Sequence, residues 1–309
     1  MIEALMLWNE PNNLSHWDFQ LDRDWRIYAR LLRESAAEVR RRATGVRISL
    51  GGISPIDPAF IRLLDSHGAL AEIDVIALHG FPLDWNHWNI HEWPRQVESI
   101  EQACGRPVWV TEAGCSSFGA DEVQLFGLET TARLLLNRVE RVYWYSLMDL
   151  PPAWPATTRH RESEGSAYYR HYYMGLVRAD GNCKPAFYRF PAGMGLCQWF
   201  HFEDPRLPQA IQLMRQLGVR KLRTGLSWAD WYRPGAEAWF DTQMRMLAEF
   251  DMTLTLCYTP AHLGLQPQHN SPPSRTEEFV RFAGWVADRY CRRQTQPAKA
   301  AADADLQPV

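Results

Sequence analysis

Residues 107–147 read PVWVTEAGCSSFGADEVQLFGLETTARLLLNRVERVYWYSL, and this stretch decides the fold. The apolar run at 107–111 predicts a buried strand, residues 121–137 have the apolar spacing of a helix, and the run at 139–147 predicts a second strand. Parallel strands need a long crossover connection, which is usually a helix. The stretch therefore predicts one βαβ unit of a parallel sheet.

The same alternation of strand and helix continues on both sides of this unit. Further strands are predicted at 2–8, 46–51, 73–78, 196–201, 219–226 and 253–258. Helices are predicted at 24–43, 58–67, 93–104, 205–217, 236–250 and 275–290, with a short one near 184. Eight such strands predict a closed (β/α)8 TIM barrel of the α/β class. No glycine-rich phosphate-binding motif follows a strand, which argues against a nucleotide-binding fold.

The composition fits an ordinary globular protein. Of the 309 residues, 46% are apolar and 22% charged, and the net charge of −3 gives no electrostatic hold on nucleic acid or on an anionic membrane. We expect residues 1–291 to form a single catalytic barrel and residues 292–309 to be a disordered tail. The sequence shows neither a secretion leader nor an apolar run of about 20 residues, so we expect a cytoplasmic location. The oligomeric state is not predicted.

Two glutamates occupy equivalent positions at the ends of predicted strands. Glu10 follows IEALMLWN at 2–9, and Glu112 follows PVWVT at 107–111. Barrel enzymes carry their reactive side chains at the carboxyl ends of the strands. These two strands lie three apart in order, so their ends face each other across the barrel mouth. Two carboxyl groups about 5–5.5 Å apart are the requirement of a retaining glycosidase. We therefore predict Glu10 and Glu112 as the catalytic pair.

Around these glutamates the sequence resembles clan A glycoside hydrolases. The motif WNEPN at 8–12 looks like their acid/base motif on barrel strand four, and VTEAG at 110–114 looks like their nucleophile motif on strand seven. HGFP at 79–82 resembles the strand-six segment that carries an active-site histidine. Family 39, which includes β-xylosidases and exopolysaccharide hydrolases, is the family we suggest. The resemblance implies a retaining hydrolase of β-linked glycosides that acts by double displacement, with an oligosaccharide or polysaccharide as its partner.

The order of the motifs differs from that of the clan. Strand four normally follows strands one to three, whereas here its motif stands at 8–12 and the segments expected for the missing strands follow at 196–201, 219–226 and 253–258. We therefore predict a circularly permuted barrel, in which residues 1–190 supply strands four to eight and residues 194–291 supply strands one to three. The alternative is a truncated barrel followed by an unrelated C-terminal half.

Supporting roles follow from position within this resemblance. Arg223 would keep Glu112 ionised, Asn9 would donate to the sugar 2-hydroxyl, and His79 and Tyr258 would orient the carboxylates. Several of the fourteen tryptophans lie in or beside loops at the predicted mouth, where an indole ring stacks well on a sugar. We predict Trp85, Trp88, Trp144 and Trp228 as substrate-binding residues, with Trp93, Trp154 and Trp231 nearby. His87 and His91 have ligand spacing but lack a third convergent ligand, so no metal or cofactor is predicted.

The sequence is also compatible with two other functions. A transglycosidase would use the same two glutamates, with a sugar in place of water as the final acceptor. A non-catalytic carbohydrate-binding barrel would need neither glutamate, so the presence of both argues against it.

Overall fold

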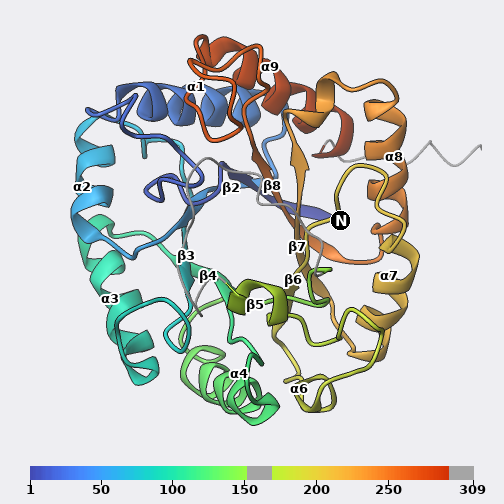
Figure 1. Cartoon of the computed structure of the whole chain (residues 1–309). Helices are drawn as coiled ribbons and strands as arrows, with labels where there is room; N and C mark the ends of the chain where they lie inside the picture. Colours follow the sequence, from blue (N-terminus) through green and yellow to red (C-terminus); the bar gives the residue numbers. More distant parts are fainter. Residues whose placement is uncertain (152–168, 292–309) are drawn as a thin grey trace, which may run out of the picture.

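A computed structural model describes residues 1–151 and 169–291, and its strands form a closed barrel in chain order (Figure 1). Each strand pairs in parallel with the next, and the last pairs with the first. The strands are β1 (Ile2–Leu7), β2 (Arg47–Ile53), β3 (Val75–Gly80), β4 (Val108–Ala113), β5 (Val142–Tyr145), β6 (Gly195–Cys197), β7 (Lys221–Ser227) and β8 (Asp251–Cys257).

Helices surround the barrel on its outer side (Figure 1). They are α1 (Arg26–Arg42), α2 (Pro58–Ser66), α3 (Trp93–Cys104), α4 (Asp121–Leu135), α6 (Pro185–Tyr188), α7 (Leu207–Gln216), α8 (Ala236–Met246) and α9 (Thr276–Val286). Short helical turns lie at η1 (Ile90–Glu92), η2 (His171–Tyr173), η3 (Asp230–Tyr232) and η4 (Ala287–Cys291). In the two described ranges, no helix is both long and apolar enough to cross a membrane.

The predicted (β/α)8 barrel is confirmed, and β6, β7 and β8 complete its ring. This rules out the alternative of a truncated barrel with an unrelated C-terminal half. A closed ring has the same strand neighbours wherever its chain is cut, so the circular permutation stays a prediction. The predicted tail at 292–309 lies outside the described residues, as does Trp154.

Helix α1 illustrates why these segments become helices. Its buried residues recur at helical spacing and include Tyr28, Leu32 and Val39. The helix begins where the Asp22 carboxylate accepts hydrogen bonds from the backbone N–H groups of Ile27 and Tyr28, both at 3.0 Å. Such a carboxylate satisfies N–H groups that have no partner within the first turn of a helix.

Strands β5 and β6 are shorter than the apolar runs predict. The carboxamide of Gln198 accepts hydrogen bonds from the backbone N–H groups of Leu147 and Met148, each at 3.2 Å. A side chain thus takes the place of the next pair of ladder hydrogen bonds, and regular pairing of the two strands ends at Tyr145 and Cys197. Hydrophobic pattern alone does not reveal such a substitution.

Candidate active site

A cavity of about 130 Å³ opens among side chains that come from the carboxyl ends of the strands and the loops beyond them. Its lining combines charged and aromatic groups: Asn9, Glu10, His16, Phe81, Trp85, Glu112, Tyr145, His171, Cys197, Trp199, Arg223 and Tyr258. Both predicted catalytic glutamates therefore border one space at the mouth of the barrel. This is where barrel enzymes place their reactive groups.

Glu10 is held in place by hydrogen bonds to both of its carboxylate oxygens. His79 Nδ1 lies 2.6 Å from Oε1, and the Asn13 side-chain amide donates to Oε2 at 2.9 Å. His16 Nε2 lies 3.4 Å from the same Oε2. Only 5% of Glu10 is exposed, so these contacts replace most of its hydration.

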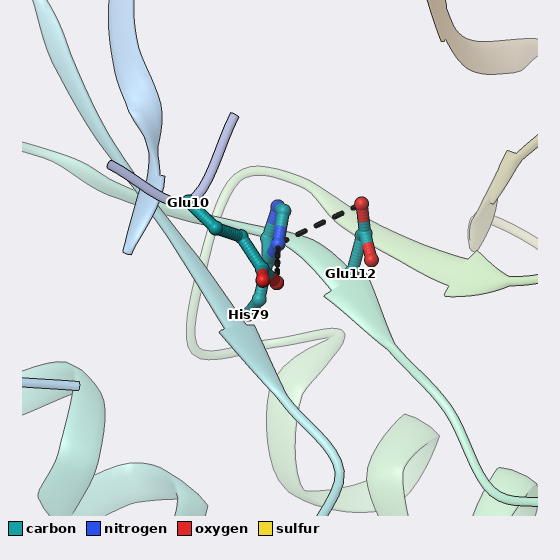
Figure 2. A group of neighbouring side chains, drawn as sticks. All are labelled: Glu10, His79 and Glu112. Carbon is teal, nitrogen blue, oxygen red and sulfur yellow. Dashed lines mark hydrogen bonds and ion pairs between the residues drawn. The ribbon is translucent and has the colours of Figure 1, made fainter. Parts of the chain in front are cut away.

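His79 lies between the two glutamates, and its side chain is fully buried (Figure 2). Its Nδ1 atom is also 3.6 Å from Glu112 Oε1, and its Nε2 atom is 3.0 Å from the Thr111 hydroxyl. The ring fits against Gly52 of β2, where an added Cβ would lie 2.0 Å from Nε2. Three neighbouring strands thus fix one imidazole, and the imidazole fixes Glu10.

Glu112 is paired with a buried cation. Arg223 donates to Glu112 Oε1 through one nitrogen and to Asn9 Oδ1 through another at 2.5 Å. Burial alone lowers the pKa of Arg223, but the adjacent Cys197 and Glu112 outweigh it and raise that pKa above its ordinary value. The guanidinium therefore stays charged and places a positive charge directly against the Glu112 carboxylate.

Cys197 is a thiol in this cavity, and its Sγ atom is 3.1 Å from Arg223. Burial raises the pKa of Cys197 to about 12. Since the thiolate is the reactive form, this cysteine is a poor nucleophile.

The backbone at the cavity adopts a left-handed conformation at three non-glycine residues. The φ angles are 74° at Trp8, 41° at Glu10 and 75° at Tyr258. Such a conformation costs roughly 1–2 kcal/mol for each residue with a Cβ atom. It is maintained here by tertiary hydrogen bonds, including Trp8 N–H to the Leu256 carbonyl at 2.8 Å. Strained residues of this kind cluster at functional sites.

The spacing of Glu10, His79 and Glu112 would also suit a metal ion, since one ligand atom from each lies within 4.8 Å of the others. However, Arg223 already places a positive charge against Glu112. A second cation at the same carboxylate would be repelled.

The structure brings most of the predicted site residues together. Asn9, Glu10, Trp85, Glu112, Arg223 and Tyr258 line the cavity, and His79 contacts both glutamates. Three predicted sugar-binding tryptophans lie elsewhere. Trp144 is fully buried in the core, and Trp228 packs its edge against Phe279 of α9. Trp88 packs against Trp93, with ring centroids 4.9 Å apart.

Other cavity residues were not predicted, and two of them follow from simple signals. Tyr145 is the neighbour of Trp144, and successive side chains of a strand point to opposite faces. Since the Tyr143 hydroxyl contacts Thr253 across the barrel, Tyr145 shares the inward face and Trp144 the outward one. Trp199 packs over Gly225, where an added Cβ would lie 1.9 Å from its ring. A glycine in a barrel strand often marks such a close approach.

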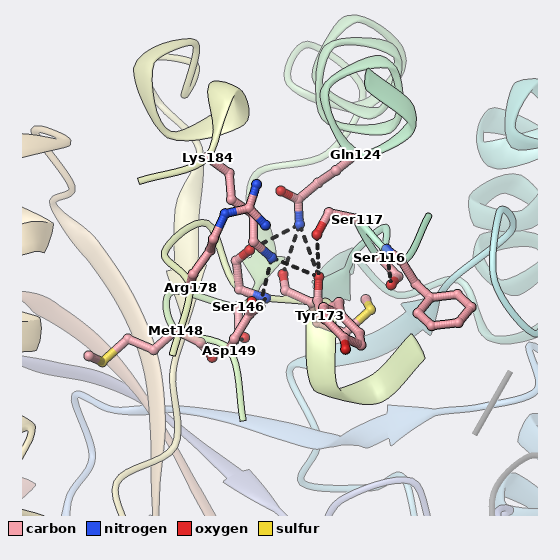
Figure 3. Close-up of polar contacts among 12 residues, drawn as sticks. Ser116, Ser117, Gln124, Ser146, Met148, Asp149, Tyr173, Arg178 and Lys184 are labelled. Carbon is pink, nitrogen blue, oxygen red and sulfur yellow. Dashed lines mark hydrogen bonds and ion pairs between the residues drawn. The ribbon is translucent and has the colours of Figure 1, made fainter. Parts of the chain in front are cut away.

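His171 comes from a segment that no sequence motif connects to the site. Its ring stacks on Trp85 with centroids 4.4 Å apart, and the neighbouring Arg170 donates to the Leu83 carbonyl at 2.7 Å. Figure 3 shows how the following residues are anchored. The fully buried Lys184 donates to Asp149 at 2.7 Å and to the Tyr173 carbonyl at 3.0 Å. Lys184 thus links the residues around Tyr173 to Asp149, which lies in the loop after β5.

One family model matches part of this chain. Residues 1–153 match the model of a family described as "Glycosyl hydrolase catalytic core". The matched stretch carries both Glu10 and Glu112. It supports a glycoside hydrolase, whereas the relationship to family 39 stays a prediction. No curated protein matches the chain.

Among solved structures, similarity is low. A GH128 (subgroup V) exo-beta-1,3-glucanase from Cryptococcus neoformans is 15% identical, with 62% of this chain and 69% of that chain covered and a TM-score of 0.39. A GH128 (subgroup II) endo-beta-1,3-glucanase from Sorangium cellulosum is 18% identical, with coverages of 60% and 67% and a TM-score of 0.37. A sugar phosphate isomerase/epimerase from Parabacteroides distasonis is 8% identical, with coverages of 94% and 95% and a TM-score of 0.40.

Proposed function

We propose that this protein is a retaining glycoside hydrolase that cleaves β-linked glycosides. The observation that carries the proposal is the close approach of the two carboxylates, because one oxygen of Glu10 and one oxygen of Glu112 lie within 4.8 Å of each other. Retaining glycosidases hold their carboxyl groups about 5–5.5 Å apart, whereas inverting ones leave about 6.5–9.5 Å for a water molecule. The separation favours the retaining geometry.

The surroundings of each glutamate support its role. Glu112 forms an ion pair with Arg223, and we propose it as the nucleophile. In the first step, a Glu112 oxygen attacks the anomeric carbon, the bond to the leaving oxygen breaks, and Glu10 gives that oxygen its proton. In the second step, Glu10 takes a proton from water, the water oxygen attacks the anomeric carbon, and the bond to Glu112 breaks.

The cavity wall suits a carbohydrate. Phe81, Trp85, Tyr145 and Trp199 provide apolar ring surface, and Asn9 provides an amide beside the two glutamates. Sugar rings combine apolar faces with hydroxyl groups, so such a lining matches both kinds of surface. We propose oligosaccharides or polysaccharides as substrates, with β-xylosides or a bacterial exopolysaccharide as the leading classes.

This function is tested by measuring the hydrolysis of glycosides and the rescue of an inactive variant by azide. We expect hydrolysis of at least one member of a panel of nitrophenyl β-glycosides, xylo-oligosaccharides and β-1,3-linked gluco-oligosaccharides. Glu112→Ala should abolish turnover, and azide should restore it with formation of a glycosyl azide of inverted configuration. The exposed Glu122→Ala serves as the control. Absence of turnover on the whole panel would favour the binding barrel, and rescue confined to Glu10→Ala would reverse the two roles. Oligosaccharide products longer than the substrate would identify a transglycosidase.

We also propose that the order of barrel segments is circularly permuted relative to clan A. Met1 and Cys291 line one cavity at the amino end of the barrel, so the residues to be joined lie on the same side of the barrel. A chain in which residue 291 is linked to residue 1 and which is opened at Gly193 should keep fold and activity. Failure of this variant to fold would contradict the proposal.

A further inference from the structure

His16 is a neighbour of Glu10 that neither the motif nor the mechanism above employs. Its Nε2 atom is 3.4 Å from Glu10 Oε2, and its Nδ1 atom is 3.4 Å from the side-chain nitrogen of Asn9. Both distances are long for hydrogen bonds. Contacts of catalytic acids in sites without substrate are often long and tighten when the substrate binds.

The position of the proton on His16 follows from its neighbours. Arg223 has only N–H donors, so the Asn9 atom that it contacts at 2.5 Å must be the amide oxygen. The Asn9 nitrogen then faces His16, and this nitrogen can only donate. His16 Nδ1 must therefore accept, and the neutral ring carries its proton on Nε2, which faces Glu10.

As a result, an imidazole meets each oxygen of the Glu10 carboxylate. His79 lies at Oε1 on the buried side, where its side chain is fully enclosed. His16 lies at Oε2 and lines the cavity, with 13% of its side chain exposed. Since His16 lines the cavity beside Oε2, we infer that Oε2 is the oxygen that meets the substrate; its neighbours include His16 and the donor Asn13.

We propose that His16 is a positioning residue for Glu10 and donates its Nε2–H to Glu10 Oε2. Arg223 fixes the orientation of the Asn9 amide, and this amide in turn fixes which nitrogen of His16 carries the proton. The proposal rests on the proposed function of Glu10 as the acid/base. Arg223 also holds Glu112, so one cation organises both carboxylates: the nucleophile directly, and the acid/base through Asn9 and His16.

The chemical effect arises in the first step. As the Glu10 proton moves from Oε2 to the leaving oxygen and the glycosidic C–O bond breaks, negative charge grows on Oε2. A donor aimed at that atom stabilises the transition state more than the ground state. The ionisable groups near His16 include Glu10 and His269, which lies in the loop after β8.

Nitrogen NMR of ¹⁵N-histidine-labelled protein tests the proton position without any substrate. His16→Gln assigns the signals by their loss. At neutral pH we expect a neutral His16 ring with a proton on Nε2 only. In Asn9→Asp the new carboxylate can only accept, so Nδ1 should gain a proton. A wild-type ring protonated on Nδ1, or an Asn9→Asp protein with an unchanged Nδ1 signal, would overturn the proposal.

Kinetics test the positioning role. His16→Leu should lower kcat/KM for phenyl β-glycosides about 10-fold, as expected for one lost hydrogen bond. For 2,4-dinitrophenyl β-glycosides, whose leaving group needs no proton, the loss should stay below about 3-fold. His16→Gln retains an N–H donor and should recover most of the activity. The matched control is His87→Leu, an exposed histidine of another mouth loop.

The outcomes separate the two proposals. An equal loss on both substrates, or no loss on either, would overturn the role of His16 while leaving the hydrolase intact. If wild-type protein hydrolyses neither series nor the wider panel, the proposed function fails, and the NMR result alone decides the Arg223–Asn9–His16 arrangement.

Discussion

Two buried arginines lie at opposite ends of the barrel, and they are used differently. Arg223, near the mouth, contacts Glu112 and Asn9, both of which line the open cavity. Arg141, just before β5 at the amino end, contacts Glu3 and donates to the Tyr143 hydroxyl at 3.2 Å. Its guanidinium also lies over the Trp109 ring, 4.2 Å from the centroid.

The two networks differ in the groups that each arginine contacts. The Arg141 network joins residues of the barrel wall to one another, and the Tyr143 hydroxyl continues it to Thr253 at 2.8 Å. The Arg223 network includes the Glu112 carboxylate, which lines the cavity at the barrel mouth. Polar contacts among residues of the barrel wall stabilise a fold, whereas polar groups that line the mouth of a barrel can also position a ligand. The amino end of the barrel should therefore govern stability and the mouth should govern activity.

The largest effect is expected at Arg223. In Arg223→Lys the charge remains, but one ammonium cannot reproduce the forked contacts to Glu112 and Asn9. We expect kcat/KM to fall about 1000-fold, in the range found for loss of a preorganised electrostatic contact. Steady-state kinetics and thermal unfolding measure the two effects. A large drop in Tm with activity retained would contradict the comparison.

A smaller loss is expected at Gly52. The Cβ atom of Gly52→Ala would lie 2.0 Å from His79 Nε2, so the imidazole must shift and carry Glu10 with it. Misplacement of a catalytic group by about 1 Å can cost about 100-fold in rate. Gly45, before β2, has nothing within 4 Å of an added Cβ, so Gly45→Ala is the control. Equal kcat/KM values for the two variants would disprove the positioning of His79 by β2.

At the amino end, stability should respond instead. Arg141→Lys loses the fork to Glu3 and Tyr143 and most of the ring contact with Trp109. We expect a loss of about 2 kcal/mol in the free energy of unfolding, with kcat/KM unchanged. Urea denaturation and glycoside turnover measure these quantities. An activity loss greater than the stability loss explains would show that the two ends are coupled.

The smallest effect is a pH dependence at the mouth. Burial, with a contribution from His16, lowers the pKa of His269 to about 4 from an ordinary 6.5. Between these values the unfolded chain binds more protons than the folded one, so stability falls as the pH falls. We expect about 1 kcal/mol to be lost between pH 6 and pH 5, and this loss to vanish in His269→Gln. An Arg141→Lys protein should keep the wild-type slope.

Sequence reasoning predicted the barrel and the two glutamates because both depend on local patterns. Apolar runs mark the strands, and Glu10 and Glu112 each follow such a run directly. Side-chain direction was harder to predict. Trp144 and Tyr145 are adjacent aromatics on β5, and a choice wrong by one residue reverses the face. The roles of His16 and His171 depend on where their loops return, which no periodicity encodes.

The pairing of β1 with β8 has a consequence for synthesis. The loop that carries the proposed acid/base follows β1, yet the backbone of Trp8 is held by Leu256, and Asn9 contacts Arg223 across 214 residues of chain. A growing chain therefore cannot assemble Glu10 into its working geometry until β8 has been made. Contacts of such long sequence separation slow folding. Activity should consequently appear only after the last strand has left the ribosome, and an incomplete chain should have no hydrolytic activity in the cell.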